Sequence, residues 1–283
     1  MLFTFYDERL AAMPFLCVDG VVPDGLSLSH WPGNRTPQHL RADTSTEMAL
    51  KLARDPERDT WLKGVTIVTN NHFDTDGLLS VYAVLHPEEA LQHEKALVMA
   101  ARAGDFGEFN RPEAFRFDAV VKAFDDDLRS PLGAAIRGLP EHERYQTIYD
   151  HLLGLLPGLL YETGRFKSLW SSALGEAMRA MMHIGQVVRV REHDASRLTV
   201  FEASEPIARI ARFNCARHHR VLTATHSDDG FIYEMAFQVF SWFDTVTPPR
   251  GSRIDLAPLA GRFQESETGG EGRWTYAGND SLD

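Results

Sequence analysis

The stretch between residues 65 and 85 constrains the fold of this chain more than any other, because a strand pattern changes to a helix pattern across one short loop. Residues 65–68 are mostly apolar and β-branched, which predicts a buried strand. Apolar residues then recur at helical spacing over residues 78–85. A strand that leads through a loop into a helix predicts an α/β sheet. In open α/β sheets, ligands bind at the carboxyl ends of the strands.

The loop between this strand and helix carries three side chains of the kind that bind metal ions. His72, Asp74 and Asp76 alternate along one extended turn, so their side chains can converge. Gly77 follows them, and we expect it to permit the tight backbone turn into the helix. The alternative is a polar loop in which an aspartate such as Asp76 caps the helix. The order of these residues directly after a strand favours a metal site.

Two further strand ends and one helix end carry residues of the same type. Residues 15–20 predict a second buried strand with Asp19 at its carboxyl end. A brief alternating run then predicts a third strand that ends at His30. Asp105 lies between two glycines, where the helix predicted for residues 89–103 gives way to a loop. For Asp105 alone, a purely structural turn is an equally good interpretation.

The pattern changes between residues 160 and 185, which predicts two domains. Thr44 and Glu47 have the spacing of a capping box and predict a helix start, and helical patterns continue from residue 112 to residue 160. Beyond this point pairs of strands flank short turns: 186–191 with 198–201, and 220–225 with 231–237 around Asp228-Asp229-Gly230. We therefore predict an α/β fold, with a mostly parallel sheet flanked by helices in residues 1–160 and a smaller β-rich α+β domain in residues 161–283.

Composition and charge limit the class of protein. The chain has 283 residues, of which 43% are hydrophobic, as in soluble globular proteins. Its apolar runs are too short to span a membrane, and the N-terminus lacks the cationic start of a signal peptide. Cys17 and Cys215 lie in apolar surroundings, which predicts buried free thiols and a cytoplasmic location. A net charge of −11 argues against duplex DNA as a partner, but it allows a small phosphorylated substrate whose charge a metal ion offsets.

The element ends together present four carboxylates and two imidazoles: Asp19, His30, His72, Asp74, Asp76 and Asp105. This donor set suits Mn²⁺ or Mg²⁺ better than structural zinc, which favours thiolates. Six ligands suit two ions that share a carboxylate. Such a pair of ions stabilises the attacking and leaving oxygens of a phosphoryl transfer.

These segments resemble motifs of the DHH phosphoesterase superfamily, which includes single-strand exonucleases, oligoribonucleases, cyclic-dinucleotide phosphodiesterases and manganese pyrophosphatases. The similar segments are CVDG at 17–20, LSHWPGNRTP at 28–37, DTSTEMALKLA at 43–53, HFDTDG at 72–77 and ARAGDFG at 101–107. The resemblance implies a DHH-like fold with two Mn²⁺ ions, and possible use of Mg²⁺ in their place. It assigns one ion to Asp19, His72 and Asp74. It assigns the other to Asp19, His30, Asp76 and Asp105, with Asp19 bridging the two.

The chain departs from the family pattern in two ways. The segment with His72 usually comes first in the family, whereas here the segments with Asp19 and His30 precede it. The resemblance therefore implies a circular permutation, which a fold tolerates where the rejoined ends lie close together at the surface. The DHH triplet itself is Ser29-His30-Trp31, so the metal-binding middle histidine is kept. Trp31 replaces the last histidine, which in relatives helps to bind phosphate, and this predicts altered or lost activity.

Five cationic or imidazole side chains are candidates for substrate contacts: Arg35, Arg41, Arg217, His218 and His219. The first two are close in sequence to His30, and the other three are equally consistent with an exposed polar strand entry. The leading hypothesis is a two-metal phosphoesterase that hydrolyses a small phosphorylated substrate such as a nucleotide or short oligonucleotide. The alternative is a non-catalytic metal- or nucleotide-binding protein on the same fold. A third hypothesis is a different metal hydrolase whose ligands include His218 or His219.

Overall fold

The first sheet has four short parallel strands in the order β1-β4-β2-β3. The strands are β1 (Leu2–Phe3), β2 (Phe15–Val18), β3 (Leu26–Leu28) and β4 (Ile67–Thr69). The computed structural model describes residues 1–228, 230–248, 253–268 and 272–276. β2 is buried throughout its length and pairs with both β3 and β4. Because the strands are parallel, their carboxyl ends lie at the same edge of the sheet.

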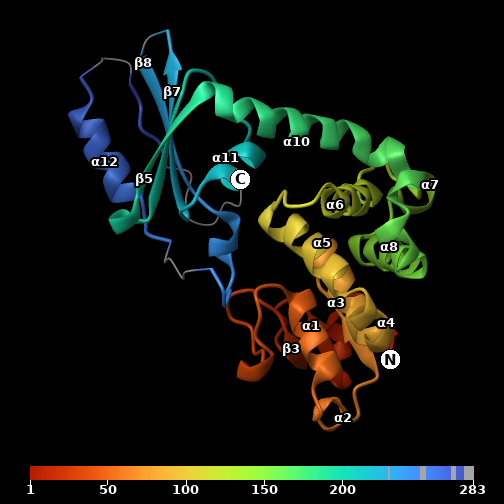
Figure 1. Cartoon of the computed structure of the whole chain (residues 1–283). Coiled ribbons are helices and arrows are strands. Elements are labelled where there is room, and N and C mark those ends of the chain that lie inside the picture. Colours follow the sequence, from red (N-terminus) through yellow and green to blue (C-terminus); the bar gives the residue numbers. More distant parts are fainter. Residues whose placement is uncertain (229, 249–252, 269–271, 277–283) are drawn as a thin grey trace.

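Helices cover this sheet and form most of the N-terminal half (Figure 1). They are α1 (Ser45–Arg54), α2 (Arg58–Trp61), α3 (Thr75–Leu85), α4 (Pro87–Gln92), α5 (Glu94–Phe106), α6 (Pro112–Phe124), α7 (Gly133–Ile136), α8 (Glu141–Leu155) and α9 (Gly158–Tyr161). The helix predicted for residues 89–103 is in fact split between α4 and α5, with His93 between them. α5 also runs past the predicted helix end at residue 103 to Phe106, so Asp105 lies in its last turn rather than in a loop.

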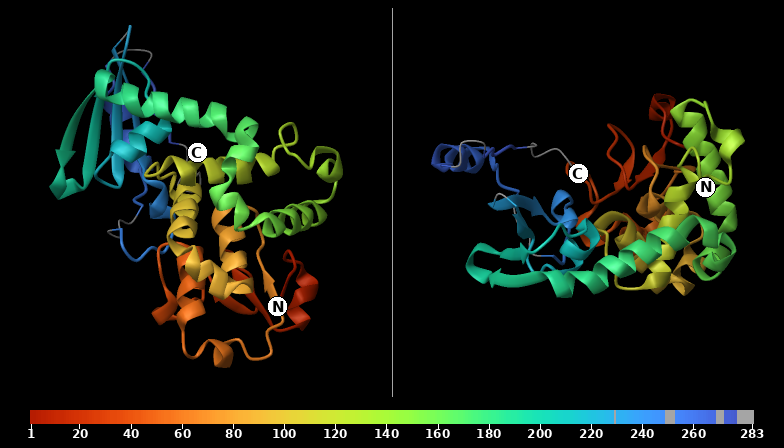
Figure 2. Two further views of the ribbon diagram at one scale, coloured as in Figure 1. Left: turned by 45° about the vertical axis from the view of Figure 1, so that its right-hand side comes forward. Right: turned by 90° about the horizontal axis from the view of Figure 1, so that it is seen from above.

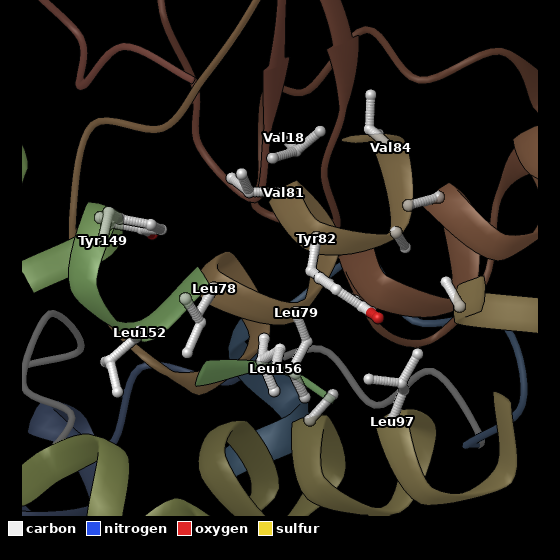
Figure 3. Close-up of a cluster of buried hydrophobic side chains, with 14 of the residues drawn as sticks. Val18, Leu78, Leu79, Val81, Tyr82, Val84, Leu97, Tyr149, Leu152 and Leu156 are labelled. Atoms are coloured by element: carbon white, nitrogen blue, oxygen red, sulfur yellow. The ribbon is translucent and has the colours of Figure 1, made fainter. Parts of the chain in front are cut away.

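The central helix of this half is α3, which is buried on all sides. An α-helix that is apolar around its whole circumference belongs in a protein interior. Figure 3 shows its side chains packed among Val18 of β2, Leu97 of α5, and Tyr149 and Leu152 of α8. Burial of one such side chain stabilises the fold by about 1.5–3 kcal/mol. Because α3 begins directly after the loop with His72, this packing also fixes the position of that loop.

The second sheet is mixed and has the order β5-β6-β7-β8. The helices and strands of the C-terminal half are α10 (Lys167–Val187), β5 (Val188–His193), β6 (Leu198–Ala203), α11 (Arg209–Cys215), β7 (Arg220–Ser227), β8 (Gly230–Phe237) and α12 (Ala257–Ser266). The two outer strand pairs are antiparallel, but β6 and β7 run parallel because α11 connects them. Within the described part of the chain, no helix is both long and apolar enough to cross a membrane.

The long helix α10 joins the two halves. Leu169, near its start, belongs to the large N-terminal core, whereas Ile184, near its end, packs with Phe201 and Val221 in a smaller core. Figure 1 shows α10 running from the region of α6 and α8 to the second sheet, and the right-hand view of Figure 2 shows the two halves at opposite ends of it. The halves are therefore joined by a continuous helix rather than by a loose linker.

The expected combination of an α/β half with a parallel sheet and a β-rich half is confirmed, with corrections in detail. The parallel β6–β7 pair was not predicted, and β1 was missed because it has only two residues. The second residue of the predicted turn, Asp229, lies outside the described residues. The prediction of two buried thiols was wrong for Cys215, which is exposed at the end of α11; Cys17 is buried in β2.

Candidate metal centre

All six side chains that the sequence singled out converge at the carboxyl edge of the first sheet. They form two groups of potential ligands, and the ligand atoms within each group lie within 4.8 Å of one another. Asp19, His30, Asp76 and Asp105 form the inner group, in which every side chain is buried or nearly so. His72 and Asp74 join Asp19 in the outer group, and both of these side chains are 31% exposed. Asp19 is thus common to a closed group and to one that faces solvent.

The two imidazoles lie among the carboxylates. His30 Nε2 is 3.3 Å from Asp19 Oδ1, 3.8 Å from Asp76 Oδ2 and 3.1 Å from Asp105 Oδ2. His72 Nε2 is 3.2 Å from both Asp19 Oδ2 and Asp74 Oδ2. Yet His30 Nε2 and Asp19 Oδ2 are buried atoms without a hydrogen bond of good geometry among the described residues. Buried polar atoms normally have such a partner, so each group contains one unsatisfied ligand atom: His30 Nε2 in the inner group and Asp19 Oδ2, beside His72, in the outer group.

The backbone at Asp19 is held in an unusual conformation. Its φ of 53° lies in the left-handed region, which few residues other than glycine adopt. The Asp19 N–H donates to the carbonyl of Leu28 on the neighbouring strand over 2.9 Å. The chain thus turns sharply after β2 while staying attached to β3, and the carboxylate is directed to the edge of the sheet. Such strained residues cluster at functional sites.

Asp74 and Asp76, in the loop that leads from β4 into α3, accept hydrogen bonds from different helices. Asp74 caps α3, because its Oδ1 accepts a 2.7 Å hydrogen bond from the N–H of Gly77. Asp76 instead accepts from the N–H groups of Ser45 (2.7 Å) and Thr46 (2.8 Å) at the start of α1. The free N–H groups and positive dipole end of a helix favour a carboxylate there. The alternative that an aspartate of this loop caps the following helix is therefore correct, but the capping residue is Asp74 and not Asp76.

Sequence reasoning missed Ser45 as part of the site. Its hydroxyl donates a 2.8 Å hydrogen bond to Asp19 Oδ1, while its N–H binds Asp76. The sequence did contain a signal for Ser45, because the capping box of Thr44 and Glu47 is present and places Ser45 in the first turn of α1. A helix start that close in sequence to His30 offers free N–H donors to any carboxylate beside it.

Contacts at one edge and at one face of its ring orient His30. Its Nδ1 lies 2.6 Å from the carbonyl oxygen of Asp43, which can only accept, so Nδ1 carries a proton and Nε2 faces the carboxylates. The ring of Phe243 stacks on it with a centroid separation of 4.1 Å, and the N–H of Asp244 donates to the His30 carbonyl over 2.6 Å. We call residues 243–247 the strap, because this segment of the C-terminal half covers the inner group.

Asp43 attaches the rest of the strap. Its Oδ1 accepts from the N–H groups of Val246 (2.8 Å) and Thr247 (2.7 Å), and its Oδ2 accepts from Arg102 over 3.0 Å. Burial raises the pKa of Asp43, but these donors outweigh it and hold the pKa below its usual value. No local pattern in the sequence indicated the role of Asp43 or Phe243, since their partners are distant in the chain.

Trp31, which stands at the last position of the DHH-like triplet, lies beside the outer group. Its indole is edge-on to His72, with ring centroids 5.6 Å apart, and edge-on to Phe243 at 5.0 Å. Its Nε1 is buried and has no hydrogen-bond partner among the described residues. The position of the replaced histidine thus still presents one N–H donor, on an aromatic ring.

Burial and mutual repulsion shape the charges of the centre. Burial raises the pKa of Asp76 well above its usual value, and it raises the pKa of Asp105 to about 7. Burial also opposes ionisation of Asp19, but His30 and His72 outweigh it and lower its pKa. Burial lowers the pKa of His30, yet the facing carboxylates of Asp105 and Asp19 raise it well above its usual value. The buried carboxylates therefore require protons or cations beside them.

Two glycines allow the elements of the centre to approach closely. Gly77 does not have the positive φ that a tight turn requires, so the conformational role expected for it is wrong. It is needed for space, because a Cβ there would lie 2.2 Å from Asn70 Nδ2 and 2.8 Å from the hydroxyl of Tyr149. A Cβ on Gly104 would lie 2.7 Å from the Cβ of Thr75, the first residue of α3. Gly104 thus sets the separation of α5 and α3, and with it the position of the adjacent Asp105.

We expect Gly104→Ala to displace Asp105 and to destabilise the fold by about 1–3 kcal/mol, as overpacked cores do. The matched control is Gly154→Ala in the exposed part of α8, where a Cβ would have no atom within 4 Å. Alanine there should stabilise the helix by about 1 kcal/mol. Urea unfolding followed by circular dichroism gives both values. Stabilisation by both substitutions would show that α5 and α3 are not in tight contact.

The five proposed substrate-binding residues do not join the centre in the described structure. Arg35 donates to the carbonyls of Val22, Asp24 and Gly25, and so holds the loop between β2 and β3. Arg41 donates from Nε to the carbonyl of Thr36 over 3.4 Å.

The other three lie in the turn between α11 and β7. Arg217 and His218 pair with Asp194, at 3.5 and 3.0 Å, and His219 is buried. Burial lowers the pKa of His219, and the charge of Arg220 lowers it further. Neither His218 nor His219 belongs to a group of three or more ligand-type side chains among the described residues.

Comparison with known proteins gives a family but no activity. Residues 2–282 match a family described as "Family of unknown function (DUF6687)". No curated protein and no solved structure matches the chain. Because the match spans almost the whole sequence, the chain belongs to this family of unknown function, DUF6687.

Proposed function

We propose that this protein is a two-metal phosphoesterase that hydrolyses a small phosphorylated substrate, with Mn²⁺ or Mg²⁺ bound in the candidate metal centre. The observation that carries the proposal is the convergence of four carboxylates and two imidazoles into two groups that share Asp19. Oxygen and imidazole donors of this kind suit Mn²⁺, and oxygen-rich sets suit Mg²⁺. The same grouping of six residues is the one that the resemblance to DHH phosphoesterases implies.

The residues fit such ions on the evidence of the site itself. The unpartnered His30 Nε2 lies in the inner group and the unpartnered Asp19 Oδ2 faces His72 of the outer group, so a cation in each group would satisfy one of these atoms. A cation would also offset the repulsion that helps to raise the pKa of Asp76. The inner ion would be held by Asp19, His30, Asp76 and Asp105, and the outer ion by Asp19, His72 and Asp74. Two divalent ions so placed would supply Lewis-acid stabilisation of the charge on a transferring phosphoryl group.

The protein side chains would orient the substrate and exclude water. The exposed parts of His72 and Asp74 make the outer group the side from which a substrate arrives. Trp31, edge-on to His72, would form a wall of the entrance. Phe243, which also contacts Trp31, stacks on His30 and would keep water from the inner group. A flat wall beside the phosphate favours a nucleotide or short oligonucleotide, since bases stack on aromatic rings.

A specific observation also supports a second candidate, a non-catalytic metal- or nucleotide-binding protein on the same fold. Trp31 cannot accept or donate a proton in the way that the replaced histidine can, because an indole is a donor only. Such a protein would retain the six ligands and lose turnover. The two candidates therefore agree on metal binding and differ in catalysis.

Hydrolysis of bis(p-nitrophenyl) phosphate separates the candidates. We expect the full chain to release nitrophenolate with Mn²⁺ and to stop with EDTA. Asp105→Asn should lower the rate at least about 100-fold, because electrostatic groups of an active site contribute at this level. His219→Gln, outside the centre, should retain both rate and metal content. Bound Mn²⁺ without turnover would favour the binding protein, and metal loss in His219→Gln would favour the third hypothesis.

A further inference from the structure

A pocket lies in the helical layer, apart from the metal centre. It has a volume of about 480 Å³ and is enclosed by α5, α6, α9 and the start of the short segment after α9. None of the six candidate ligands lines it. Its volume is in the range of small-molecule sites, about 300–1,000 Å³. The pocket therefore has the size of a ligand site, and nothing in the proposed phosphoesterase reaction uses it.

Three cations line this pocket: Lys95, Arg111 and Arg116. In the described structure none of them forms a salt bridge, although Glu113 also lines the pocket. The Nε of Arg116 is buried without a hydrogen-bond partner among the described residues. The chain has 40 acidic against 29 basic residues, so acidic partners are abundant elsewhere. Three unpaired cations around one cavity are mutually repulsive unless an anion enters.

The rest of the lining combines apolar side chains with a few polar ones, such as Gln92 and Thr163. Ala96, Met99, Phe117 and Leu160 provide apolar contacts, and the guanidinium of Arg116 is held over the Trp170 ring at 4.7 Å. An apolar lining with a few convergent polar groups is the usual character of a small-ligand site. A simple inorganic anion would leave the apolar surfaces without a partner, and a neutral apolar molecule would leave the cations without one.

We propose that this pocket binds a small organic anion in which a phosphate-, sulfate- or carboxylate-like head is attached to a flat apolar body. The head would meet the ammonium group of Lys95 and the guanidinium groups of Arg111 and Arg116, and guanidinium groups suit bidentate contacts with such anions. The body would lie on Met99 and Phe117. This site is independent of the metal centre, so it does not require the proposed hydrolytic function.

The test uses naphthalene-2-sulfonate, which carries both parts and has no phosphoester bond to hydrolyse. Calorimetric titration of the full chain in EDTA should give 1:1 binding in the micromolar range. Sulfate alone and 2-naphthol alone should each bind at least about tenfold more weakly, because each lacks one of the two contacts. Absence of binding by naphthalene-2-sulfonate would overturn the proposal, as would equal binding by 2-naphthol.

Variants locate the site. Lys95 and Arg111 are exposed, so Lys95→Gln with Arg111→Gln should fold normally and weaken binding at least about tenfold. Arg189→Gln, an equally exposed cation on β5, is the matched control and should leave the affinity unchanged. Asp76→Asn should also leave it unchanged. Unaltered affinity in the double variant, or loss of affinity in Asp76→Asn, would overturn the assignment to this pocket.

Discussion

Replacement of Asp19 by asparagine is expected to abolish Mn²⁺ binding at both groups of the candidate centre while the chain stays folded. Both groups use the Asp19 carboxylate, so one substitution removes a ligand from each. Asparagine tolerates the φ of 53° better than other replacements, and its Oδ1 can still accept from the Ser45 hydroxyl. We expect the affinity to fall at least about 100-fold, beyond the 10- to 100-fold typical of groups that only support a ligand.

Asp126→Asn is the matched control for this substitution. Asp126 accepts from the N–H groups of Leu128 and Arg129 in a turn outside the centre, and asparagine can keep these bonds. Isothermal titration with Mn²⁺ gives the two affinities, and thermal unfolding with and without Mn²⁺ shows whether each variant is folded. Equal affinity in the two variants would remove Asp19 from the ligand set.

Replacement of Asp43 by alanine is expected to have the largest effect on stability, about 3 kcal/mol. The substitution leaves the N–H groups of Val246 and Thr247 without their acceptor, and it leaves the partly buried Arg102 with fewer partners. Removing one partner of a buried charged pair typically costs about 3–5 kcal/mol. Since Arg102 also pairs with Glu108 at 2.7 Å, we place the expected loss at the lower end.

Asp43→Asn tests which contact of Asp43 matters. Asparagine keeps an acceptor for the strap but no charge for Arg102, so its loss of stability should be intermediate. Urea unfolding measures the free energies, and hydrogen exchange at the amides of Val246 and Thr247 measures attachment of the strap. Wild-type protection of these amides in Asp43→Ala would show that Phe243 and Asp244 hold the strap without Asp43.

The N-terminal half could be predicted well because its signals are local. The change of period between residues 65 and 85 places a strand and helix on either side of the loop, and the structure has β4 and α3 there. Asp19, His30 and the loop residues all follow strands of one parallel sheet, so their meeting at one edge required no long-range information. For this reason these five candidate ligands could be named from the sequence.

The supports of the centre could not be predicted, because they depend on contacts between distant residues. Phe243 has no pattern around it that indicates a site. Asp43 begins the DHH-like segment 43–53, but nothing there indicates its contact with the strap, which forms only once the two halves meet. Arg35 was nominated because it is near His30 in sequence, but its guanidinium binds three backbone carbonyls instead. Position in the sequence thus predicted which residues at strand ends lie at the centre. It was misleading for long side chains such as that of Arg35, which can extend to partners away from the centre.

The position of the strap also fixes the order in which the site is completed during synthesis. Protein chains emerge from the ribosome N-terminus first, and domains commonly fold as they appear. All six candidate ligands lie before residue 106, whereas Phe243 and its neighbours come after the second sheet. A nascent chain would therefore present the inner group uncovered until the second sheet and the strap have been synthesised.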